Sequence, residues 1–372
     1  MFILFAVVGE DREERMSPRT ARAVIAALVV VIAASFAWVA LRPAVARTVD
    51  RRVVVGDGQR VQAPELVAPA GFLNSEPVTL ASLRGKVVLI DFWTYSCINC
   101  QRTFPYIRQW WDTYRDNGLV VLGVHTPEFD FEAIEANVAA VLPRYGVTWP
   151  VVLDPQRRTW NAWSNRYWPA KYLVDRNGRV AYAHFGEGQY LATEQAIRAL
   201  LSEGGADPGP PALTGAEPPG SSRRDQTPEL YAGYQRGGLA NQGGYRRDVL
   251  ANYTLPVQPP SEGFAVGGSW TARLESLETS ATGASVIVPF QAGLVHMVAS
   301  GSTNVVVTLD DLPVPPDRRP TGMTVRPDGS TALHIDRADL YTLIDGPTFG
   351  RGVLRLRVDG DRFSLYSFTF GA

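Results

Sequence analysis

The two cysteines of this chain, Cys97 and Cys100, form a Cys-x-x-Cys pair and leave no other cysteine in 372 residues. The largely apolar run Val87–Phe92 is typical of a strand buried on both faces, and a helical pattern from Cys97 to Asn117 follows it. Two thiols one helical turn apart can close a disulfide, exchange it, or bind a metal. A purely structural disulfide is disfavoured, because so short a loop constrains little of the unfolded chain.

The sequence favours redox chemistry over metal binding. A structural zinc site normally has four Cys or His ligands at characteristic spacings. The chain has no second Cys-x-x-Cys and no His-x3-His, and its four histidines are scattered. Folding could bring His125 near the cysteines, so the metal interpretation stays open as the lesser one, and no metal or other cofactor is expected.

The composition is that of a globular protein, with 45% hydrophobic residues, 20% charged residues and a formal net charge of -1. A chain of this length is typical of two or more domains. A net charge near zero offers no basic field for DNA or RNA, so no nucleic acid is expected among the partners.

An uncharged apolar run extends from Ala23 to Leu41, about the length of a helix that crosses a membrane. It is either an uncleaved transmembrane anchor or a long signal peptide with a cleavage site near Ala44 to Ala46. Its length favours the anchor, with residues 1–22 as a leader. Because an N-terminal span followed by a long soluble region normally exports that region, we expect a single-pass protein of the cell membrane with its soluble part extracytoplasmic.

Two folded domains are predicted after this segment. Residues 53–203 alternate strands and helices, including a strand Leu119–His125 and a helix Glu132–Tyr145, as in an α/β domain. Residues 204–226 are dense in Pro and Gly and predict a linker. Residues 227–372 contain short β-like runs separated by turn residues, which favours an all-β sandwich. These runs include residues 285–290, 294–299, 340–343 and 353–358.

The position of the cysteines assigns their roles. Cys97 lies where the predicted helix begins, and helix N-termini carry partial positive charge and free N–H groups that stabilise a thiolate. Cys100 lies one turn further on and is expected to be less exposed. We therefore predict that Cys97 is the nucleophile that forms a mixed disulfide and that Cys100 resolves it.

The surrounding residues carry a resemblance to a known family. The string DFWTYSCINC at residues 91–100, with Pro105 five residues on, resembles the active site of the thioredoxin superfamily in its TlpA/redoxin-like branch. The chain is also similar to the C-terminal soluble region of DipZ-type thiol:disulfide interchange proteins over most of residues 64–372. The matching strings lie at residues 91–102, 123–129, 165–170, 185–188 and 366–371.

The resemblance implies roles for residues outside the pair. Pro169 matches the family's cis-proline, which would leave the backbone of Trp168 free to pair with a substrate peptide. Asp91 matches a buried acid behind the cysteines that would accept a proton from Cys100. A simple ion pair of Asp91 with Lys86 or an arginine is the alternative. Trp93 is expected to pack against the active-site loop.

Three neighbouring residues keep two interpretations each. Tyr95 would either shape the surface beside Cys97 or be an ordinary exposed aromatic residue. Glu128 and His125 would either line the active-site cleft or serve a structural role, and the structural role is favoured.

The resemblance also implies partners. DipZ-type proteins carry a multi-span, electron-transferring membrane domain, whereas this chain has one predicted span. A separate membrane electron donor similar to CcdA or DsbD is therefore expected, with protein thiols and disulfides as substrates. The C-terminal domain resembles a carbohydrate-binding module, which adds a cell-wall glycan as a partner. The aromatic residues that could stack on sugars are Tyr231, Tyr234, Trp270 and Tyr341.

Together these features predict an extracytoplasmic, membrane-anchored thiol–disulfide oxidoreductase of the reductase or interchange type. One alternative is a glycan- or protein-binding module in which the thioredoxin-like domain is a scaffold, but the intact Cys-x-x-Cys with its matching prolines argues against it. A second alternative is a redoxin-type thiol peroxidase, a class that does not need a Cys-x-x-Cys pair.

Overall fold

A computed structural model describes residues 54–213 and 225–371, which belong to the compact unit Asp50–Ala372. The predicted leader, the apolar run Ala23–Leu41 and residues 214–224 of the predicted linker lie outside the described residues. Among the helices that the structure describes, none is long and apolar enough to cross a membrane.

The first domain is built on a seven-stranded sheet in the order β1-β7-β6-β3-β4-β5-β2. Strand β3 lies at its centre, parallel to β4 and antiparallel to β6, and all seven of its residues are buried. The strands are β1 (Val61–Gln62), β2 (Gly71–Leu73), β3 (Val87–Trp93), β4 (Leu119–His125), β5 (Val151–Leu153), β6 (Ala170–Val174) and β7 (Arg179–Phe185).

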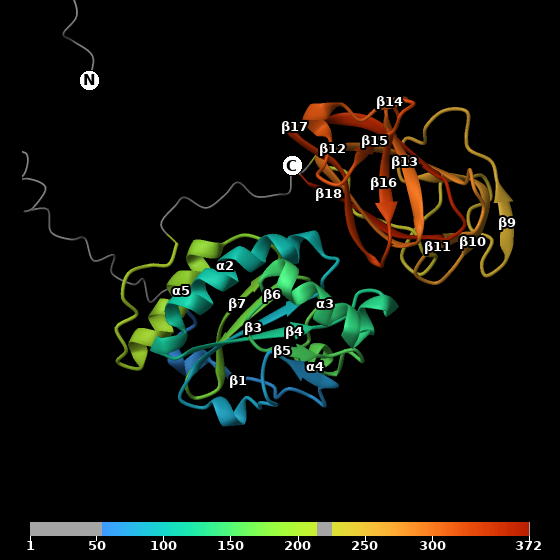
Figure 1. Cartoon of the computed structure of the whole chain (residues 1–372). Coiled ribbons are helices and arrows are strands. Elements are labelled where there is room, and N and C mark those ends of the chain that lie inside the picture. Colours follow the sequence, from blue (N-terminus) through green and yellow to red (C-terminus); the bar gives the residue numbers. More distant parts are fainter. Residues whose placement is uncertain (1–53, 214–224, 372) are drawn as a thin grey trace, which may run out of the picture. The chain divides into compact units, whose positions relative to one another are not determined.

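Helices cover both faces of this sheet (Figure 1). Helices α2 and α5 pack together, and the rings of Tyr106 and Tyr190 stack with their centroids 3.6 Å apart. On the other face, Phe92 of β3 meets Trp160 of α4 edge-on at 5.8 Å within an apolar cluster. The helices are α2 (Ile98–Tyr114), α3 (Glu135–Tyr145), α4 (Arg158–Ala162) and α5 (Tyr190–Glu203). Short 3-10 helices are η2 (Asp57–Gln59), η3 (Ala81–Leu83), η4 (Arg115–Asn117) and η5 (Asp130–Ala133).

This domain follows the predicted order of strands and helices, with one correction. The predicted helix Glu132–Tyr145 is two helices, η5 and α3, separated by Ile134 in an extended conformation. The break arises because the side chain of Glu132 is buried and accepts hydrogen bonds from the backbone of the preceding turn, as described below.

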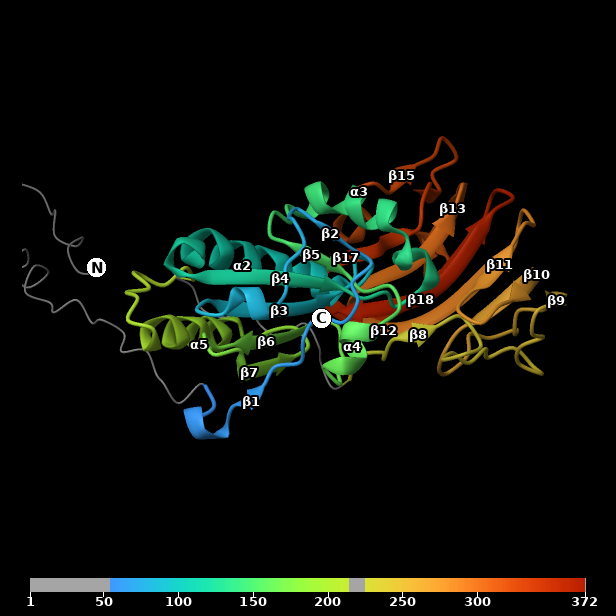
Figure 2. The same ribbon diagram turned by 90° about the horizontal axis from the view of Figure 1, so that it is seen from below.

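The second domain contains only strands and one short 3-10 helix, η6 (Pro316–Arg318), among its described residues. The strands form one eleven-stranded sheet around a single hydrophobic core (Figure 2). They are β8 (Leu230–Tyr231), β9 (Leu250–Tyr253), β10 (Ala265–Ala272), β11 (Leu277–Thr279), β12 (Ser285–Gly301), β13 (Thr303–Leu309), β14 (Leu312–Pro313), β15 (Thr324–Val325), β16 (Thr331–Ile335), β17 (Asp339–Val358) and β18 (Phe363–Gly371).

The β-rich character of this domain is confirmed, but the prediction of uniformly short strands was wrong. Residues 285–290 and 294–299 belong to the single strand β12, and residues 340–343 and 353–358 belong to β17. Register shifts near Gly293 show that irregular residues are accommodated as bulges, which bend a strand without ending it.

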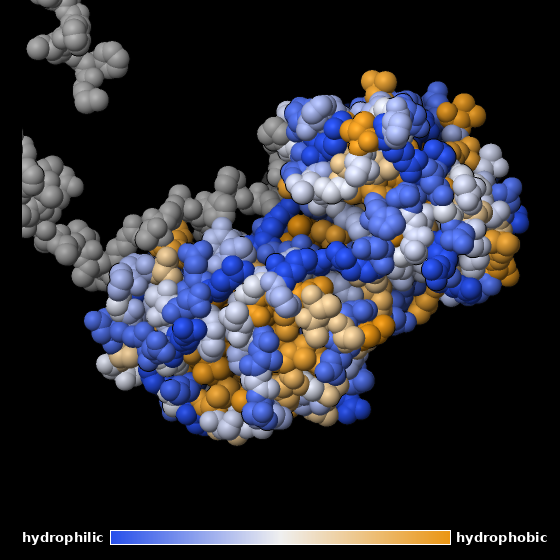
Figure 3. Space-filling model, viewed as in Figure 1, coloured by the Kyte–Doolittle hydropathy of each residue, from blue (hydrophilic) through white to orange (hydrophobic). Residues whose placement is uncertain are grey.

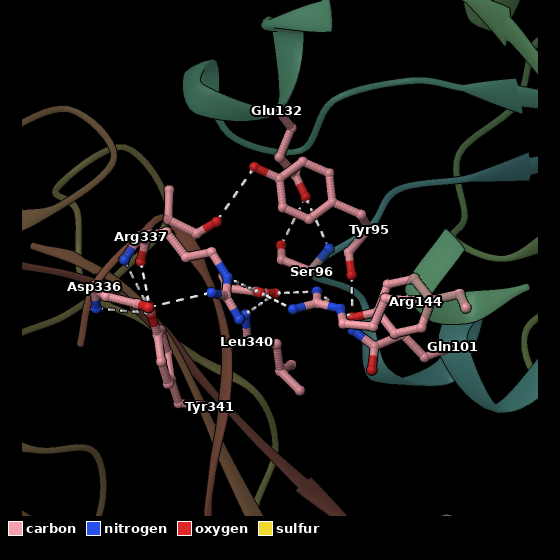
Figure 4. A network of polar contacts seen from close by, with 12 residues as sticks. Tyr95, Ser96, Gln101, Glu132, Arg144, Asp336, Arg337, Leu340 and Tyr341 are labelled. Atoms are coloured by element: carbon pink, nitrogen blue, oxygen red, sulfur yellow. Dashed lines mark hydrogen bonds and ion pairs between the residues drawn. The ribbon is translucent and has the colours of Figure 1, made fainter. Parts of the chain in front are cut away.

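The two domains are joined by polar and aromatic contacts. Arg144 of α3 forms a two-pronged ion pair with Asp339 of β17, with N–O distances of 2.5 and 2.9 Å (Figure 4). The backbone N–H of Asp130 donates to Glu275 at 2.9 Å, and the ring of Phe131 meets Tyr366 at 4.7 Å. On the face seen in Figure 3, hydrophilic residues predominate and hydrophobic residues gather in smaller patches.

Candidate functional site

The Cys-x-x-Cys pair lies at the start of α2, directly after the turn that follows β3. Cys97 is the residue preceding the helix, with extended backbone angles φ -83° and ψ 111°, and its Sγ accepts a hydrogen bond from the Cys100 N–H at 3.3 Å. Both cysteines are free thiols; Cys97 is half-buried and Cys100 is fully buried. The half-buried Cys97 and the fully buried Cys100 therefore differ in their accessibility, as the predicted roles require.

Burial controls the protonation of the inner thiol. The pKa of Cys100 lies well above its ordinary value, mainly because burial disfavours a thiolate there, and because the neighbouring Cys97 and the Asp91 charge act in the same direction. Cys100 therefore holds its proton until a base removes it.

Asp91 lies behind the cysteines, where it faces Lys171 rather than Lys86 or an arginine. The two residues are register partners in the antiparallel pair β3–β6, and both are buried. Burial raises the pKa of Asp91 to about 7, an effect that the Lys171 charge partly opposes. Burial likewise lowers the pKa of Lys171, and the Asp91 charge opposes that change. Neither Asp91 Oδ1 nor Lys171 Nζ has a hydrogen-bond partner among the described residues.

Sequence reasoning missed Lys171 as part of the site. The available signal was a lysine in an otherwise apolar strand, immediately after Pro169 and Ala170. A fully buried ammonium is rare unless it has a charged partner, so this lysine should have indicated an acid on the neighbouring strand.

A cleft of about 330 Å³ opens beside Cys97. From the first domain it is lined by the α2 start and by Trp168, whose peptide bond to Pro169 is cis. The Trp168 indole N–H donates to the Thr126 carbonyl at 2.9 Å, which fixes this wall of the cleft. The substrate-docking role of Pro169 stays a prediction.

Trp93 packs in the core, and its contact with the active-site loop stays a prediction. It is fully buried, and its ring lies edge-on to Phe104 of α2 at 5.2 Å and to His125 at 4.8 Å. Tyr95 is also buried, so its interpretation as an ordinary exposed residue was wrong. The Tyr95 ring stacks on His125 at 5.8 Å, and its hydroxyl donates to the Ala338 carbonyl of the second domain at 3.4 Å.

His125 has a structural environment. Its ring is enclosed by aromatic residues, and Nε2 lies 3.4 Å from the Thr94 hydroxyl. Burial lowers the pKa of His125 to about 3, so the imidazole is neutral at physiological pH. Within residues 54–213 and 225–371, no group of three or more His, Cys, Asp or Glu residues is arranged to hold a metal ion.

Glu132 organises the turn before Cys97, a role that the sequence did not indicate. Its Oε1 accepts hydrogen bonds from the Ser96 N–H at 3.1 Å and the Ser96 hydroxyl at 2.7 Å (Figure 4). Its Oε2 accepts from the N–H groups of Glu128 at 2.6 Å and Phe129 at 3.0 Å. The pKa of Glu132 is raised mainly by complete burial.

The second domain supplies the remaining wall of the cleft. Glu128 from the first domain does line the cleft, and it is joined there by residues far away in the sequence. Those from the second domain are Glu229, Tyr231, Arg236, Val298 and Thr369.

The four aromatic residues considered for sugar stacking do not form one exposed platform. Trp270 is fully buried, with its indole N–H bonded to the Gly267 carbonyl, so it cannot stack on a sugar. The hydroxyls of Tyr234 and Tyr341 bond to Asp248 and to the Arg337 carbonyl, respectively. Tyr231 lines the cleft beside Cys97.

A Cys-x-x-Cys pair that follows a central strand and opens a helix defines a thioredoxin-like redox protein. Family models agree: residues 60–183 match the AhpC/TSA family, and residues 227–371 match the thioredoxin like C-terminal domain.

The chain is similar to several known proteins. Protein DipZ of Mycobacterium bovis and of Mycobacterium tuberculosis is 39% identical over 257 residues, which is 68% of this chain; the chain spans only 37% of the length of these relatives. Thiol-disulfide oxidoreductase YkuV of Bacillus subtilis is 30% identical over 145 residues, or 39% of this chain and 97% of YkuV. The solution structure of a thioredoxin-like protein in its oxidized form is 30% identical, covers 39% of this chain and 97% of its own, and has a TM-score of 0.36. The chain belongs to the thioredoxin superfamily of thiol–disulfide oxidoreductases.

Proposed function

We propose that this chain exchanges thiols and disulfides with protein substrates, with Cys97 as the nucleophile and Cys100 as the resolving thiol. The observation that carries this proposal is the asymmetry of the pair. The Cys97 sulfur lies at a helix N-terminus and lines a cleft, whereas Cys100 is buried and protonated behind it.

The chemistry of reduction runs in two steps. The Cys97 thiolate attacks one sulfur of a substrate disulfide, which forms a mixed disulfide and releases the other sulfur as a thiolate. Asp91 then takes the proton of Cys100, because the pKa of Asp91 of about 7 lets it accept and release a proton near neutral pH. The Cys100 thiolate attacks the Cys97 sulfur, the substrate leaves as a thiol, and two electrons have passed from the cysteine pair to the substrate.

The direct test is reduction of insulin disulfides in the presence of dithiothreitol. We expect the wild-type protein to accelerate the reaction, Cys97→Ser to be inactive, and Cys100→Ser to accumulate a mixed disulfide on Cys97. Activity that survives in Cys97→Ser would refute this mechanism. Peroxide consumption by the same preparations tests the redoxin-type peroxidase alternative.

We further propose that the chain is anchored in the cell membrane by residues 23–41, with its folded part extracytoplasmic. The apolar run in the sequence supports this proposal. Digestion of intact cells by an added protease should remove the folded part, and its protection would contradict the orientation.

A reductase in an oxidising compartment needs a supply of electrons. We therefore propose a separate membrane thiol relay similar to CcdA or DsbD as the electron donor. The redox state of the cysteine pair in cells, followed by thiol alkylation, should shift from reduced to oxidised when such a relay is deleted. A pair that stays reduced would exclude the relay as donor.

Glycan binding by the second domain is a second candidate function. A cavity of about 840 Å³ in this domain is lined by amide, carboxylate and guanidinium groups, including those of Gln291, Asp310 and Arg351, which suit the hydroxyls of a sugar. Calorimetric titration with a panel of cell-wall glycans tests it, with Arg351→Ala as the matched variant. Flat titrations across the panel would remove this candidate.

A further inference from the structure

The cleft beside Cys97 contains a carboxyl group that the reaction outlined above does not use. Glu229 precedes β8 in the second domain and lines the cleft with Cys97, although the two residues are 132 positions apart in the sequence. Glu229 is exposed as a whole residue, whereas its carboxyl group is largely surrounded by protein. A group placed in this way can meet both substrate and water.

The contacts of Glu229 require an additional proton in the cleft. The Tyr231 hydroxyl lies 2.8 Å from Glu229 Oε2 and 2.9 Å from Glu128 Oε1. A phenol has one hydrogen and an ionised carboxylate has none, so the hydroxyl can donate to only one of these oxygens. The second short O–O contact becomes a hydrogen bond only if one of the two acids is protonated.

The charges around the pair place this proton on Glu229. Arg236 Nη1 forms an ion pair with Glu128 Oε1 at 2.7 Å, so a cation is in direct contact with Glu128. Among the residues that the structure describes, no cation forms an ion pair with Glu229; its Oε1 accepts a hydrogen bond from the Thr369 hydroxyl at 3.0 Å. Burial of its carboxyl group and, next, the nearby Glu128 carboxylate raise the pKa of Glu229 to about 7, whereas the Arg236 charge lowers it. The remaining charged side chain of the cleft, Arg166, is exposed.

A role in holding the domains together does not account for Glu229. Glu128 already has two partners across the domain interface, the Arg236 guanidinium and the Tyr231 hydroxyl. The Arg236 guanidinium also lies 3.8 Å from the centre of the Tyr231 ring. Glu229 and Thr369 both come from the second domain, so their hydrogen bond does not link the domains.

We infer that Glu229 is a general acid of the thiol–disulfide exchange, contributed by the second domain. This role rests on the proposed function of the Cys97–Cys100 pair. When the Cys97 thiolate attacks a substrate disulfide, the S–S bond breaks and its electron pair goes to the leaving sulfur. That sulfur takes the Glu229 proton and departs as a thiol, and the carboxylate regains a proton from water in the cleft. The second substrate sulfur takes the proton that Asp91 removes from Cys100, so two electrons and two protons reach the substrate.

The test compares two substrates that differ in their need for a proton. A dialkyl disulfide releases a thiolate whose thiol has a pKa of about 8.5, which is protonated at neutral pH. A nitroaryl disulfide releases a thiolate that is stable without a proton. We expect Glu229→Gln to slow single-turnover reduction of the dialkyl disulfide by about 10- to 100-fold and to leave the nitroaryl reaction within about twofold.

Two variants and one control complete the experiment. Glu229→Asp keeps an acid in the cleft and should recover part of the dialkyl rate. Glu278→Gln, an exposed glutamate of β11 paired with Arg273, should leave both rates unchanged. Equal losses on both substrates, no loss on either, or an Asp variant no better than the Gln variant would each overturn the acid role. Failure of the proposed function is a different result, in which wild-type protein and Cys97→Ser reduce both substrates at the same rate.

Discussion

Replacing Asp91 by Asn should stabilise the folded protein at alkaline pH while slowing its reaction. An acid whose pKa is higher in the folded than in the unfolded state lowers stability as the pH rises from its unfolded to its folded pKa, and the full loss is present above the folded pKa. The pKa of Asp91 rises from 3.8 to about 7, and each pKa unit corresponds to about 1.36 kcal/mol, so ionised Asp91 costs the fold about 4 kcal/mol. Asn does not ionise, but it leaves Lys171 without its counter-charge, and we therefore expect a net gain of about 2–4 kcal/mol at pH 8.

The pH dependence separates this effect from a general change in packing. At pH 4 Asp91 is largely protonated in the folded protein, so the advantage of Asp91→Asn should nearly disappear. The advantage should grow between about pH 4 and pH 7, where only the unfolded state loses the proton, and stay level above pH 7. Urea unfolding followed by tryptophan fluorescence is a suitable assay, because every described tryptophan except Trp270 lies in the first domain. A gain of this size moves the urea midpoint by about 1 M.

The matched control is Asp112→Asn, an exposed residue of α2, which should change the free energy of unfolding by less than about 0.5 kcal/mol. Single-turnover kinetics should show that Asp91→Asn still forms the mixed disulfide but resolves it slowly. The reasoning about Asp91 would be refuted by a variant that is less stable than wild type at pH 8, or by one that is more stable by the same amount at pH 4 and pH 8.

Three other changes follow from the described contacts. Arg144→Ala removes the main cation from the buried Asp339, so it should lower the free energy of unfolding in urea by about 1–3 kcal/mol and make the domain interface more sensitive to protease. The control Arg115→Ala, which breaks an exposed ion pair, should have little effect. Glu132→Gln points an NH₂ group at backbone or hydroxyl donors that now face a carboxylate, so it should lower the free energy of unfolding by about 1–3 kcal/mol. The same variant should slow alkylation of Cys97, and an unchanged alkylation rate would contradict the positioning role of Glu132. His125 should show no change in its imidazole NMR signals between pH 5 and 8, and a titration in that range would contradict its buried, neutral state.

Local patterns were sufficient to predict the central elements of the first domain, although not the break at Ile134. The apolar run of β3 and the helical pattern after Cys97 are properties of short segments, and both match the structure closely. The second domain was harder to read because β12 and β17 pass through bulges near glycines, which resemble turns in a sequence. A hydrogen-bonded partner on each side keeps such a strand continuous, and the sequence of one strand carries no record of its partners.

The site was predictable only as far as its residues lie near the cysteines. Lys171 acts on Asp91 across a strand pair, and the wall formed by Glu229, Tyr231 and Arg236 comes from another domain. Such contacts depend on how segments more than 70 residues apart pack, and no spacing rule in one sequence encodes them. The residue types did not indicate this second-domain wall of the cleft either, because acids and tyrosines at the polar end of a strand are ordinary surface residues.

The two sulfurs of the pair have different proton partners, and this difference explains how one cleft can serve two steps. Asp91 lies behind the pair, near enough for its charge to raise the pKa of the buried Cys100. Glu229 lines the same cleft as Cys97. Loss of Asp91 should therefore slow resolution with every substrate, whereas loss of Glu229 should slow the first attack only when the leaving sulfur needs a proton. A double variant that combines Asp91→Asn with Glu229→Gln should then form the mixed disulfide as slowly as Glu229→Gln does and resolve it as slowly as Asp91→Asn does.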